Sequence, residues 1–220
     1  SRVGVMTVLV TGGAGYIGSH VARLLLERGH RVVIADDMST GLPNRVQGLE
    51  SVHLDLASSH AVEEIRGILR AHEVTSVIHL AARKKVAESV ELPEWYYQQN
   101  VGGLVNLLEA MKAQGVSRLV FSSSAATYGM PNVPQVDEDF DCKPINPYGE
   151  TKLIGEWLAR AAGIAWGLRV VNLRYFNVAG AGWPDLADTA VANLIPIAFA
   201  AIREGNAPVV FGNDYETPDG

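Results

Sequence analysis

One stretch near the start of the chain restricts the possible folds more than any other, because an apolar run passes directly into three regularly spaced glycines. The run is 8–10, and Gly12, Gly15 and Gly18 follow it. In such a turn the first glycine permits a sharp bend, the second lets backbone approach a pyrophosphate, and the third lets a helix pack closely on the sheet. Because a helix N-terminus presents unpaired N–H groups, the pattern predicts a phosphate site. A plain turn could carry the same glycines, so the prediction needs a second signal.

That second signal is an acidic residue after the next apolar run. The run 32–35 ends in Asp36, about 20 residues beyond the glycines, where a carboxylate typically holds the ribose hydroxyls of a dinucleotide. A carboxylate also repels a 2′-phosphate, so Asp36 favours NAD over NADP, and we expect Asp37 to strengthen that repulsion. Together the two signals predict that the chain binds NAD.

Strand-like and helix-like segments alternate along the chain. This alternation predicts an α/β protein, with a Rossmann-type doubly wound parallel sheet covered by helices on both faces. We expect strands at 6–10, 31–35, 52–54, 76–80, 116–121, 168–173 and 209–211, and helices at 16–27, 61–71, 93–113, 148–161 and 189–204.

Composition narrows the classes of partner. The net charge is −6, which gives no reason to expect binding to nucleic acid or to an anionic membrane surface. No apolar run approaches the roughly 20 residues that span a bilayer. The single cysteine, Cys142, cannot form an internal disulfide, which fits a reducing cytoplasm. We expect a cytoplasmic protein without a metal site.

A tyrosine and a lysine four residues apart provide candidate chemistry. Tyr148 and Lys152 lie on the same face of a predicted helix, and the serines 122–124 end a predicted strand. A phenol has a reference pKa near 10, and a nearby ammonium would stabilise its anion so that it can act as a base. Alone, the pair could be neighbours on a solvated face; after a dinucleotide signature and a serine cluster, we interpret it as an active site.

At this point the chain resembles the extended branch of the short-chain dehydrogenase/reductase superfamily, and within it the UDP-glucose 4-epimerases. Dehydratases of the same branch carry an acid soon after the serine phrase, whereas this chain has 125–127 without one. The phrases that carry the resemblance are 11–20, 79–82, 88–90, 121–125, 128–129, 147–149 and 173–177.

The resemblance implies a reaction. The family keeps NAD tightly bound and interconverts UDP-glucose and UDP-galactose at C4 through a 4-keto sugar. Two alternatives remain open: another NAD-dependent nucleotide-sugar epimerase, or an inactive NAD-binding fragment. The resemblance also implies a homodimer formed by the helices 93–113 and 148–161. The apolar surface expected for it is Leu104, Leu107, Leu108, Leu153 and Trp157.

The resemblance further implies the site residues. Tyr148 is the expected base, Lys152 its partner and ribose anchor, and Ser124 the hydroxyl that bonds the reacting oxygen. For Asn100, a purely structural bond to backbone remains an alternative. The expected cofactor-binding residues are Gly12, Gly15, Tyr16, Ile17, Gly18, Asp36, Asp37, Asp55, Leu56, Leu80, Ala81, Ala82, Lys84, Asn100, Ser122, Tyr148, Lys152 and Tyr175. The expected UDP-sugar-binding residues are Lys84, Ser124, Tyr148, Asn177, Asn193 and Leu194.

Two departures from the family pattern qualify these expectations. Residues 126–127 reverse the usual order of a hydroxyl residue and a small apolar one, so we leave Thr127 out of the site. The family also continues beyond the position of Gly220. We therefore expect an NAD-binding domain at 1–175 and, at 176–220, the beginning of a substrate-binding region that is truncated. Such a chain should bind NAD but hold the UDP-sugar weakly.

Overall fold

A computed structural model describes residues 4–190, 193–209 and 212. The chain divides into two compact units, residues 1–176 and 177–220. The division lies beside the domain boundary expected from the sequence; the substrate-binding role of the second unit stays a prediction.

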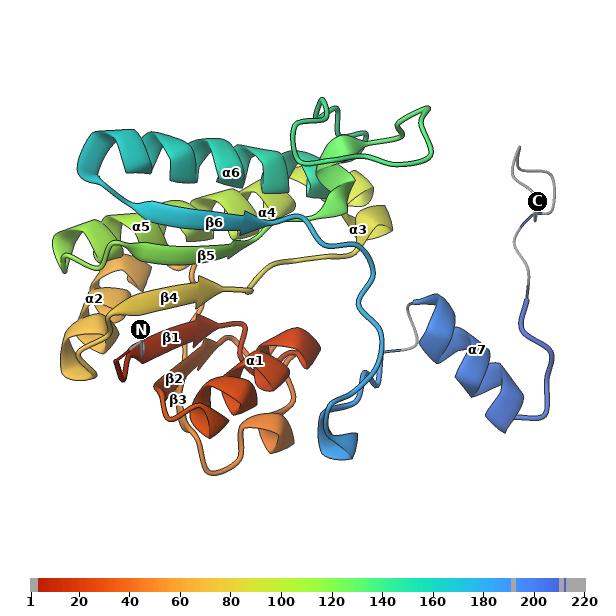
Figure 1. Ribbon diagram of the computed structural model, residues 1–220, viewed down its shortest axis with the longest axis horizontal. Coiled ribbons are helices and arrows are strands. Elements are labelled where there is room, and N and C mark those ends of the chain that lie inside the picture. The colour runs from red at the N-terminus through yellow and green to blue at the C-terminus, as the bar shows by residue number, and fades with distance from the viewer. Residues whose placement is uncertain (1–3, 191–192, 210–211, 213–220) are drawn as a thin grey trace. The chain divides into compact units, whose positions relative to one another are not determined.

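The first unit is built on one parallel sheet of six strands in the order β3-β2-β1-β4-β5-β6 (Figure 1). The strand order changes direction between β1 and β4, so the connections leave a crevice at the carboxyl ends of these two strands. The strands are β1 Thr7–Thr11, β2 Arg31–Asp36, β3 Glu50–His53, β4 Ser76–His79, β5 Arg118–Ser122 and β6 Arg169–Leu173.

Helices cover both faces of this sheet. α2, α5 and α6 lie against one face and α1 against the other (Figure 1). Along β1, Leu9 joins the core under α2, α5 and α6, whereas Val8 and Val10 join the core under α1. This alternation follows from the two-residue period of a strand, and it confirms the doubly wound fold. The helices of this unit are α1 Tyr16–Glu27, α2 Ala61–Ala71, α3 Val86–Glu91, α4 Pro93–Tyr96, α5 Gly103–Ala113 and α6 Pro147–Trp166.

The predicted helix 93–113 is helical throughout but not regular. A π-helical segment, Tyr97–Gly102, separates α4 from α5, and α3 precedes them without having been predicted. Apolar spacing predicts a helix here but does not show which turns are α-helical and which are π-helical. Such segments often mark functional sites, and this one contains Asn100.

Several boundaries also differ from the predictions. β3 begins at Glu50, and the predicted loop 38–47 contains a short 3-10 helix, Pro43–Val46. α6 continues five residues beyond 161 and ends where Gly167 adopts φ 80°. Glycine enters this left-handed region without steric cost, and it ends many helices for that reason.

The second unit contains α7, Leu194–Arg203, and a short 3-10 helix, Pro184–Leu186. The predicted helix 189–204 is therefore shorter at its start, and residues 191–192 lie outside the described residues. The predicted strand 209–211 is not seen at Val209, and residues 210–211 lie outside the described part. No helix of the described residues has the length and apolarity needed to cross a membrane.

Four of the five residues expected at a dimer surface are instead buried within the chain. Leu104, Leu107 and Leu108 on α5 belong to the core that packs against the sheet, Leu153 on α6 is buried as well, and only Trp157 is exposed, at 51%. The buried four are Leu104, Leu107, Leu108 and Leu153.

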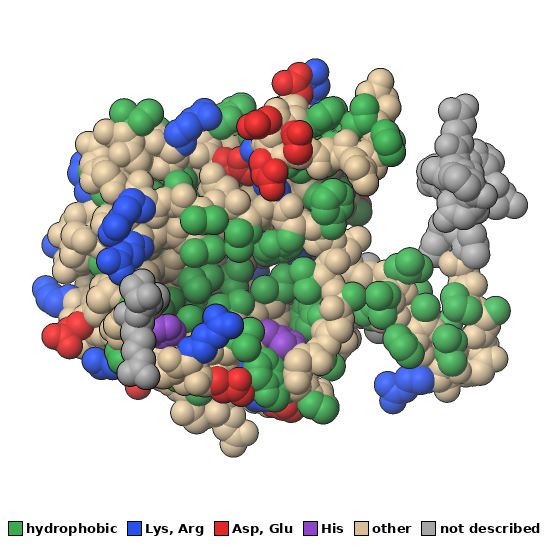
Figure 2. Space-filling model, in the orientation of Figure 1, with side chains coloured by type: hydrophobic (Ala, Val, Ile, Leu, Met, Phe, Trp, Pro, Cys, Tyr) green, Lys and Arg blue, Asp and Glu red, His purple; other side chains and the backbone are tan. Residues whose placement is uncertain are grey.

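The face of the sheet that α1 covers at β1 and β2 stays partly open further along. Val171 and Leu173 on β6 are 57% and 41% exposed, and Figure 2 shows apolar side chains gathered in the middle of this face. Among the described residues of the first unit, this face of the sheet is therefore covered at β1 and β2 and more exposed at β6.

Candidate functional site

The glycine turn leaves no room for side chains at two of its positions. Gly12 has φ 71°, and a Cβ atom there would lie 2.6 Å from the backbone nitrogen of Ala81. A Cβ atom on Gly18 would overlap the carbonyl oxygen of Gly12. The turn therefore brings bare backbone to the N-terminus of α1, where no side chain caps the helix. This is the surface that a pyrophosphate requires.

Asp36 ends β2 beside that turn and is buried. Its carboxylate accepts hydrogen bonds from the N–H of Ala14 at 3.0 Å and of Met38 at 2.9 Å. Each carboxylate oxygen can accept a further bond, so Asp36 orders the turn and remains able to receive ribose hydroxyls.

The turn, the loop after β2 and the start of α6 surround one pocket of the first unit. Every residue predicted to bind the cofactor lines this pocket. The prediction missed eight lining residues, which come mostly from loops whose approach depends on the fold: Ala35, Ser39, Thr40, Gly41, Leu54, Ala57, Arg83 and Gln99. Two of them could have been found from their neighbours in the sequence: Gly41 lies shortly after Asp36 and Asp37, and Arg83 directly precedes Lys84.

The predicted catalytic pair meets at the far end of this pocket. The Lys152 ammonium lies 5.9 Å from the centroid of the Tyr148 ring and donates a hydrogen bond to the Ser122 carbonyl at 2.7 Å. The Tyr148 hydroxyl forms a hydrogen bond with the Ser124 side chain. The spacing of four residues on α6 thus brings Tyr148 and Lys152 into the pocket lining, as predicted, whereas Ser124 bonds Tyr148 but is not among the lining residues.

Burial controls the ionisation of these groups. The pKa of Tyr148 is raised, chiefly by burial, while the hydrogen bond with Ser124 acts in the opposite direction. Lys152 is not among the causes of this shift, so its expected role in stabilising the Tyr148 anion stays a prediction. Burial also lowers the pKa of Lys152 to about 8, so this side chain is still mostly cationic at pH 7.

The start of α6 is fixed by two contacts from outside the helix. The Asn146 side chain accepts a hydrogen bond from the N–H of Gly149 at 2.9 Å, which caps the helix. The N–H of Tyr148 donates to the Ser89 hydroxyl at 3.2 Å. These contacts hold the backbone that carries Tyr148 before any ligand binds.

A buried ion pair supports the other side of α6. Glu156 accepts two hydrogen bonds from the Arg174 guanidinium, at 2.8 Å and 2.6 Å, and a short one from the Ser123 hydroxyl. Ser123 precedes Ser124, and Arg174 precedes Tyr175, whose hydroxyl bonds Ser122 at 2.5 Å. The ion pair therefore holds both strand ends that approach the catalytic groups.

Asn100 bonds the backbone of Arg83 and also lines the pocket. Its side chain accepts from the N–H of Arg83 at 2.8 Å and donates to the Arg83 carbonyl at 3.0 Å and to Thr151 at 3.1 Å. Both readings of this residue thus have support, since it bonds backbone and also lines the pocket.

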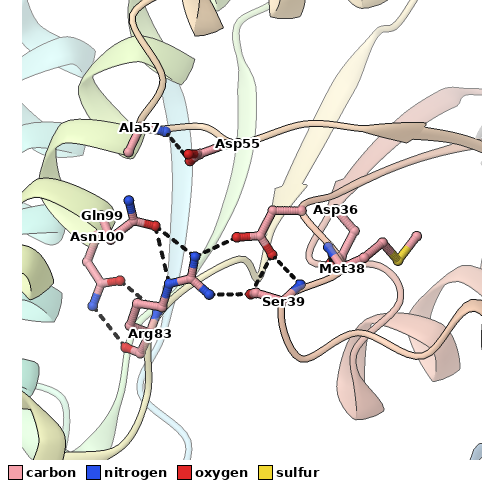
Figure 3. A network of polar contacts seen from close by, with 9 residues as sticks. Asp36, Met38, Ser39, Asp55, Ala57, Arg83, Gln99 and Asn100 are labelled. Atoms are coloured by element: carbon pink, nitrogen blue, oxygen red, sulfur yellow. Dashed lines mark hydrogen bonds and ion pairs between the residues drawn. The ribbon is translucent and has the colours of Figure 1, made fainter.

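Arg83 lies at the centre of a polar network at the other end of the pocket. Its guanidinium is 2.5 Å from the Asp37 carboxylate, and Figure 3 shows it directed at Ser39 and Gln99 as well. Burial opposes ionisation of Asp37, but hydrogen bonds from Ser39 and the charge of Arg83 outweigh it and lower the pKa of its carboxyl. The ion pair offsets the Asp37 charge that we expected to repel a 2′-phosphate, and the preference for NAD expected from Asp36 stays a prediction.

Three predicted substrate residues, Asn177, Asn193 and Leu194, belong to the second unit and stay predictions. Thr127, which we left out of the site, is buried, and its hydroxyl donates to the Ser124 carbonyl at 2.8 Å. No group of three His, Cys, Asp or Glu side chains within the described ranges could hold a metal ion.

Comparison with known proteins gives a consistent result. Residues 8–218 match the NAD dependent epimerase/dehydratase family. The UDP-glucose 4-epimerase of Azospirillum brasilense is 43% identical over 218 residues, which cover 97% of this chain. Among solved structures, the UDP-glucose 4-epimerase from Brucella ovis in complex with NAD superposes with a TM-score of 0.87 at 40% identity, covering 98% of this chain and 67% of that one.

A third relative has a different name. The UDP-Glc/GlcNAc 4-epimerase from Campylobacter jejuni superposes with a TM-score of 0.80 at 33% identity, covering 97% of this chain and 68% of that one. The chain spans 62% of the length of the Azospirillum protein. The two solved structures thus share the described fold, and this chain covers about two thirds of each of them.

Proposed function

The chain belongs to the NAD dependent epimerase/dehydratase family, and we propose that the protein interconverts UDP-glucose and UDP-galactose through a 4-keto sugar. The observation that carries this proposal is that Tyr148 and Lys152 line the same pocket as the glycine turn, while Ser124 bonds the Tyr148 hydroxyl. A dinucleotide lying along the pocket would have its pyrophosphate at the turn and its reactive ring near Tyr148.

The residues present fit NAD. Backbone without side chains at Gly12 and Gly18 suits a pyrophosphate, and the Asp36 carboxylate suits the adenosine ribose. When bound, NAD would supply the hydride acceptor and donor for C4 of the sugar. Side chains of the protein would bind the sugar and move the proton of its 4-hydroxyl.

Tyr148 exchanges a proton with the sugar 4-hydroxyl, and Ser124 bonds the same oxygen. The phenolate is costly in this buried site, and the Lys152 cation offsets part of that cost. The Lys152 ammonium is itself held by the Ser122 carbonyl, so its charge has a defined position. Lys84, which is exposed at the rim, is proposed to approach both cofactor and substrate.

A second candidate differs only in the sugar. The name of the Campylobacter protein includes GlcNAc, so we keep a UDP-N-acetylhexosamine epimerase as the alternative. The same proton-transfer groups serve either substrate, because C4 is the reacting carbon in both. An extra acetamido group changes only the space needed around the sugar.

We also propose a homodimer. Val105 on α5 and Trp157 on α6 are the exposed apolar side chains on the two helices expected at the interface, together with Ile164 near the end of α6. Apolar side chains on neighbouring helices suit a self-complementary contact. Light scattering on the full-length protein should give twice the monomer mass at micromolar concentration, and a monomer there would contradict the proposal.

The test of the main proposal is direct. The full-length protein is incubated with UDP-galactose, and UDP-glucose is followed by chromatography, with UDP-N-acetylgalactosamine in a parallel reaction. We expect conversion of UDP-galactose. Conversion of the acetylated sugar alone would select the second candidate, and no conversion by a protein that retains NAD would contradict both.

A further inference from the structure

Arg83 and Asp37 meet across the strand that begins the glycine turn. Asp37 follows β2 and Arg83 follows β4, and β1 lies between these strands in the sheet. Their ion pair therefore spans the carboxyl end of β1, which is the crevice where the dinucleotide is proposed to lie. Both residues line the pocket.

The arginine is held firmly on the side of β4. Its backbone N–H and carbonyl are both bonded by Asn100, and its guanidinium donates to Gln99 at 3.2 Å and 2.9 Å. The guanidinium also lies 5.0 Å from the centroid of the Trp95 ring, a cation–π distance. Contacts with α4 and with the π segment thus fix the position of Arg83, which forms one end of the ion pair.

The other end is a loop without regular structure. Residues 37–42 form neither helix nor strand, and this loop contributes Asp37, Ser39 and Gly41 to the pocket wall. Arg83 reaches the loop through Asp37 at 2.5 Å and through the Ser39 hydroxyl, which also donates to Asp37. The contacts across the pocket join residues 44 and 46 positions apart in sequence.

We propose that the Arg83–Asp37 ion pair is a clamp that closes the loop 37–42 over the bound dinucleotide and slows its release. The proposal rests on the proposed NAD site and adds a positioning role for residues not needed in the chemistry. The guanidinium is occupied by Asp37, Ser39 and Gln99, so it acts through the loop; a direct phosphate contact would require it to give up these partners.

The expected size of the effect follows from the partial exposure of the pair. The two side chains are 18% and 25% exposed, so the pair is screened less than a surface ion pair but remains within reach of salt. Hydrogen bonds between charged groups contribute more than neutral ones. We expect loss of the clamp to speed release of NAD about 10-fold.

Release kinetics test the clamp. Full-length protein is loaded with NAD, and released NAD is captured by an excess of an alcohol dehydrogenase with its alcohol. Arg83→Gln and Asp37→Asn should each release NAD about 10-fold faster, and the double variant no faster than the faster single variant. Added salt should speed release from the wild type and affect the double variant less.

A matched control removes another arginine–carboxylate contact. Arg66 bonds Glu63 within α2, away from the pocket lining, and Arg66→Gln should leave the release rate unchanged. Circular dichroism and urea unfolding check that each variant is folded.

Three outcomes would overturn the clamp. Faster release from Arg83→Gln together with unchanged or slower release from Asp37→Asn would identify Arg83 as a direct ligand. Single effects that add in the double variant would show that the two residues act separately. Unchanged release from all variants of a protein that holds NAD would contradict the clamp and leave the proposed function standing. A wild-type protein that binds no NAD would contradict the proposed function as well.

Discussion

At one end of the pocket the surface is mostly backbone, whereas at the other end it is made by buried side chains. The glycine end excludes even a methyl group at Gly12 and Gly18. The catalytic end depends on the functional groups of Tyr148 and Lys152, whose pKa values burial shifts. The glycine end is therefore sensitive to added volume, and the catalytic end is sensitive to the loss of a single atom. Substitutions can separate the two properties.

The largest expected effect lies at the catalytic end. Tyr148→Phe keeps the ring but removes the proton-transfer group, so turnover of UDP-galactose should fall by about 10² to 10⁴ while NAD affinity is nearly unchanged. The matched control is Tyr97→Phe, which removes a hydroxyl that donates to Glu150 at 2.7 Å outside the pocket lining. Its turnover should stay within a factor of about 3 of the wild type. Unchanged turnover in Tyr148→Phe would remove the catalytic assignment.

The next effect lies at the glycine end. Gly18→Ala places a methyl group against backbone atoms of Gly12 and Gly13, which cannot move aside. We expect the free energy of unfolding to fall by about 3 kcal/mol, measured by urea unfolding, together with loss of NAD binding. Gly67→Ala on α2 is the control, since no atom lies near its added methyl group. It should gain about 1 kcal/mol from helix propensity. Equal stability of the two variants would contradict the steric account.

Cofactor choice gives a smaller effect at the same end. The wild type should bind NAD about 10-fold or more tightly than NADP, because the Asp36 carboxylate repels a 2′-phosphate. Asp36→Asn removes this charge and should reduce the ratio of NAD affinity to NADP affinity, measured by calorimetric titration of both cofactors. A wild-type protein with equal affinity for the two would contradict the role given to Asp36.

The last prediction concerns His79, which lies between the two ends, and its effect at any one pH above about 5.5 is small. Its Nδ1 is 2.7 Å from the Thr11 hydroxyl at the glycine end, and burial, with a further contribution from the Lys152 charge, lowers its pKa to about 3. Between pH 6.5 and 3 the unfolded chain binds a proton that the folded chain does not. His79 should therefore lower the free energy of unfolding as the pH is lowered through this range, by up to about 1.4 kcal/mol per pH unit.

His79→Gln tests this linkage. The variant keeps a side chain able to bond Thr11 but lacks a titrating group. Its stability should fall less steeply than that of the wild type between pH 6 and about 4, measured by urea unfolding. Parallel pH profiles for the two proteins would show that His79 does not titrate as its burial predicts.

The elements nearest the glycine turn were the most predictable. Helix 16–27 and helix 61–71 have the bounds that periodicity and terminal residues indicated. The π segment was missed because apolar spacing predicts a helix without showing the hydrogen-bond pattern of each turn. The four leucines expected at a dimer surface were misplaced, since periodicity identifies an apolar face without revealing which element covers it.

The site residues divide in the same way. The predicted proximity of Tyr148 and Lys152 is seen because a helix brings residues four apart to one face, which is a local property; their catalytic roles stay predictions. The raised pKa of Tyr148 could not be read from that spacing, since it depends on the burial that the whole fold imposes.

By itself the sequence determined the alternation of strands and helices, the glycine turn with its acidic partner, and which groups are proposed to carry the chemistry. These depend on periodicity, on backbone freedom and on side-chain type, which are properties of short segments. Only the tertiary structure decided that Arg83 meets Asp37, that Glu156 meets Arg174, and that His79 stays neutral. Those outcomes depend on strand order and burial, which bring distant residues together and exclude water from them.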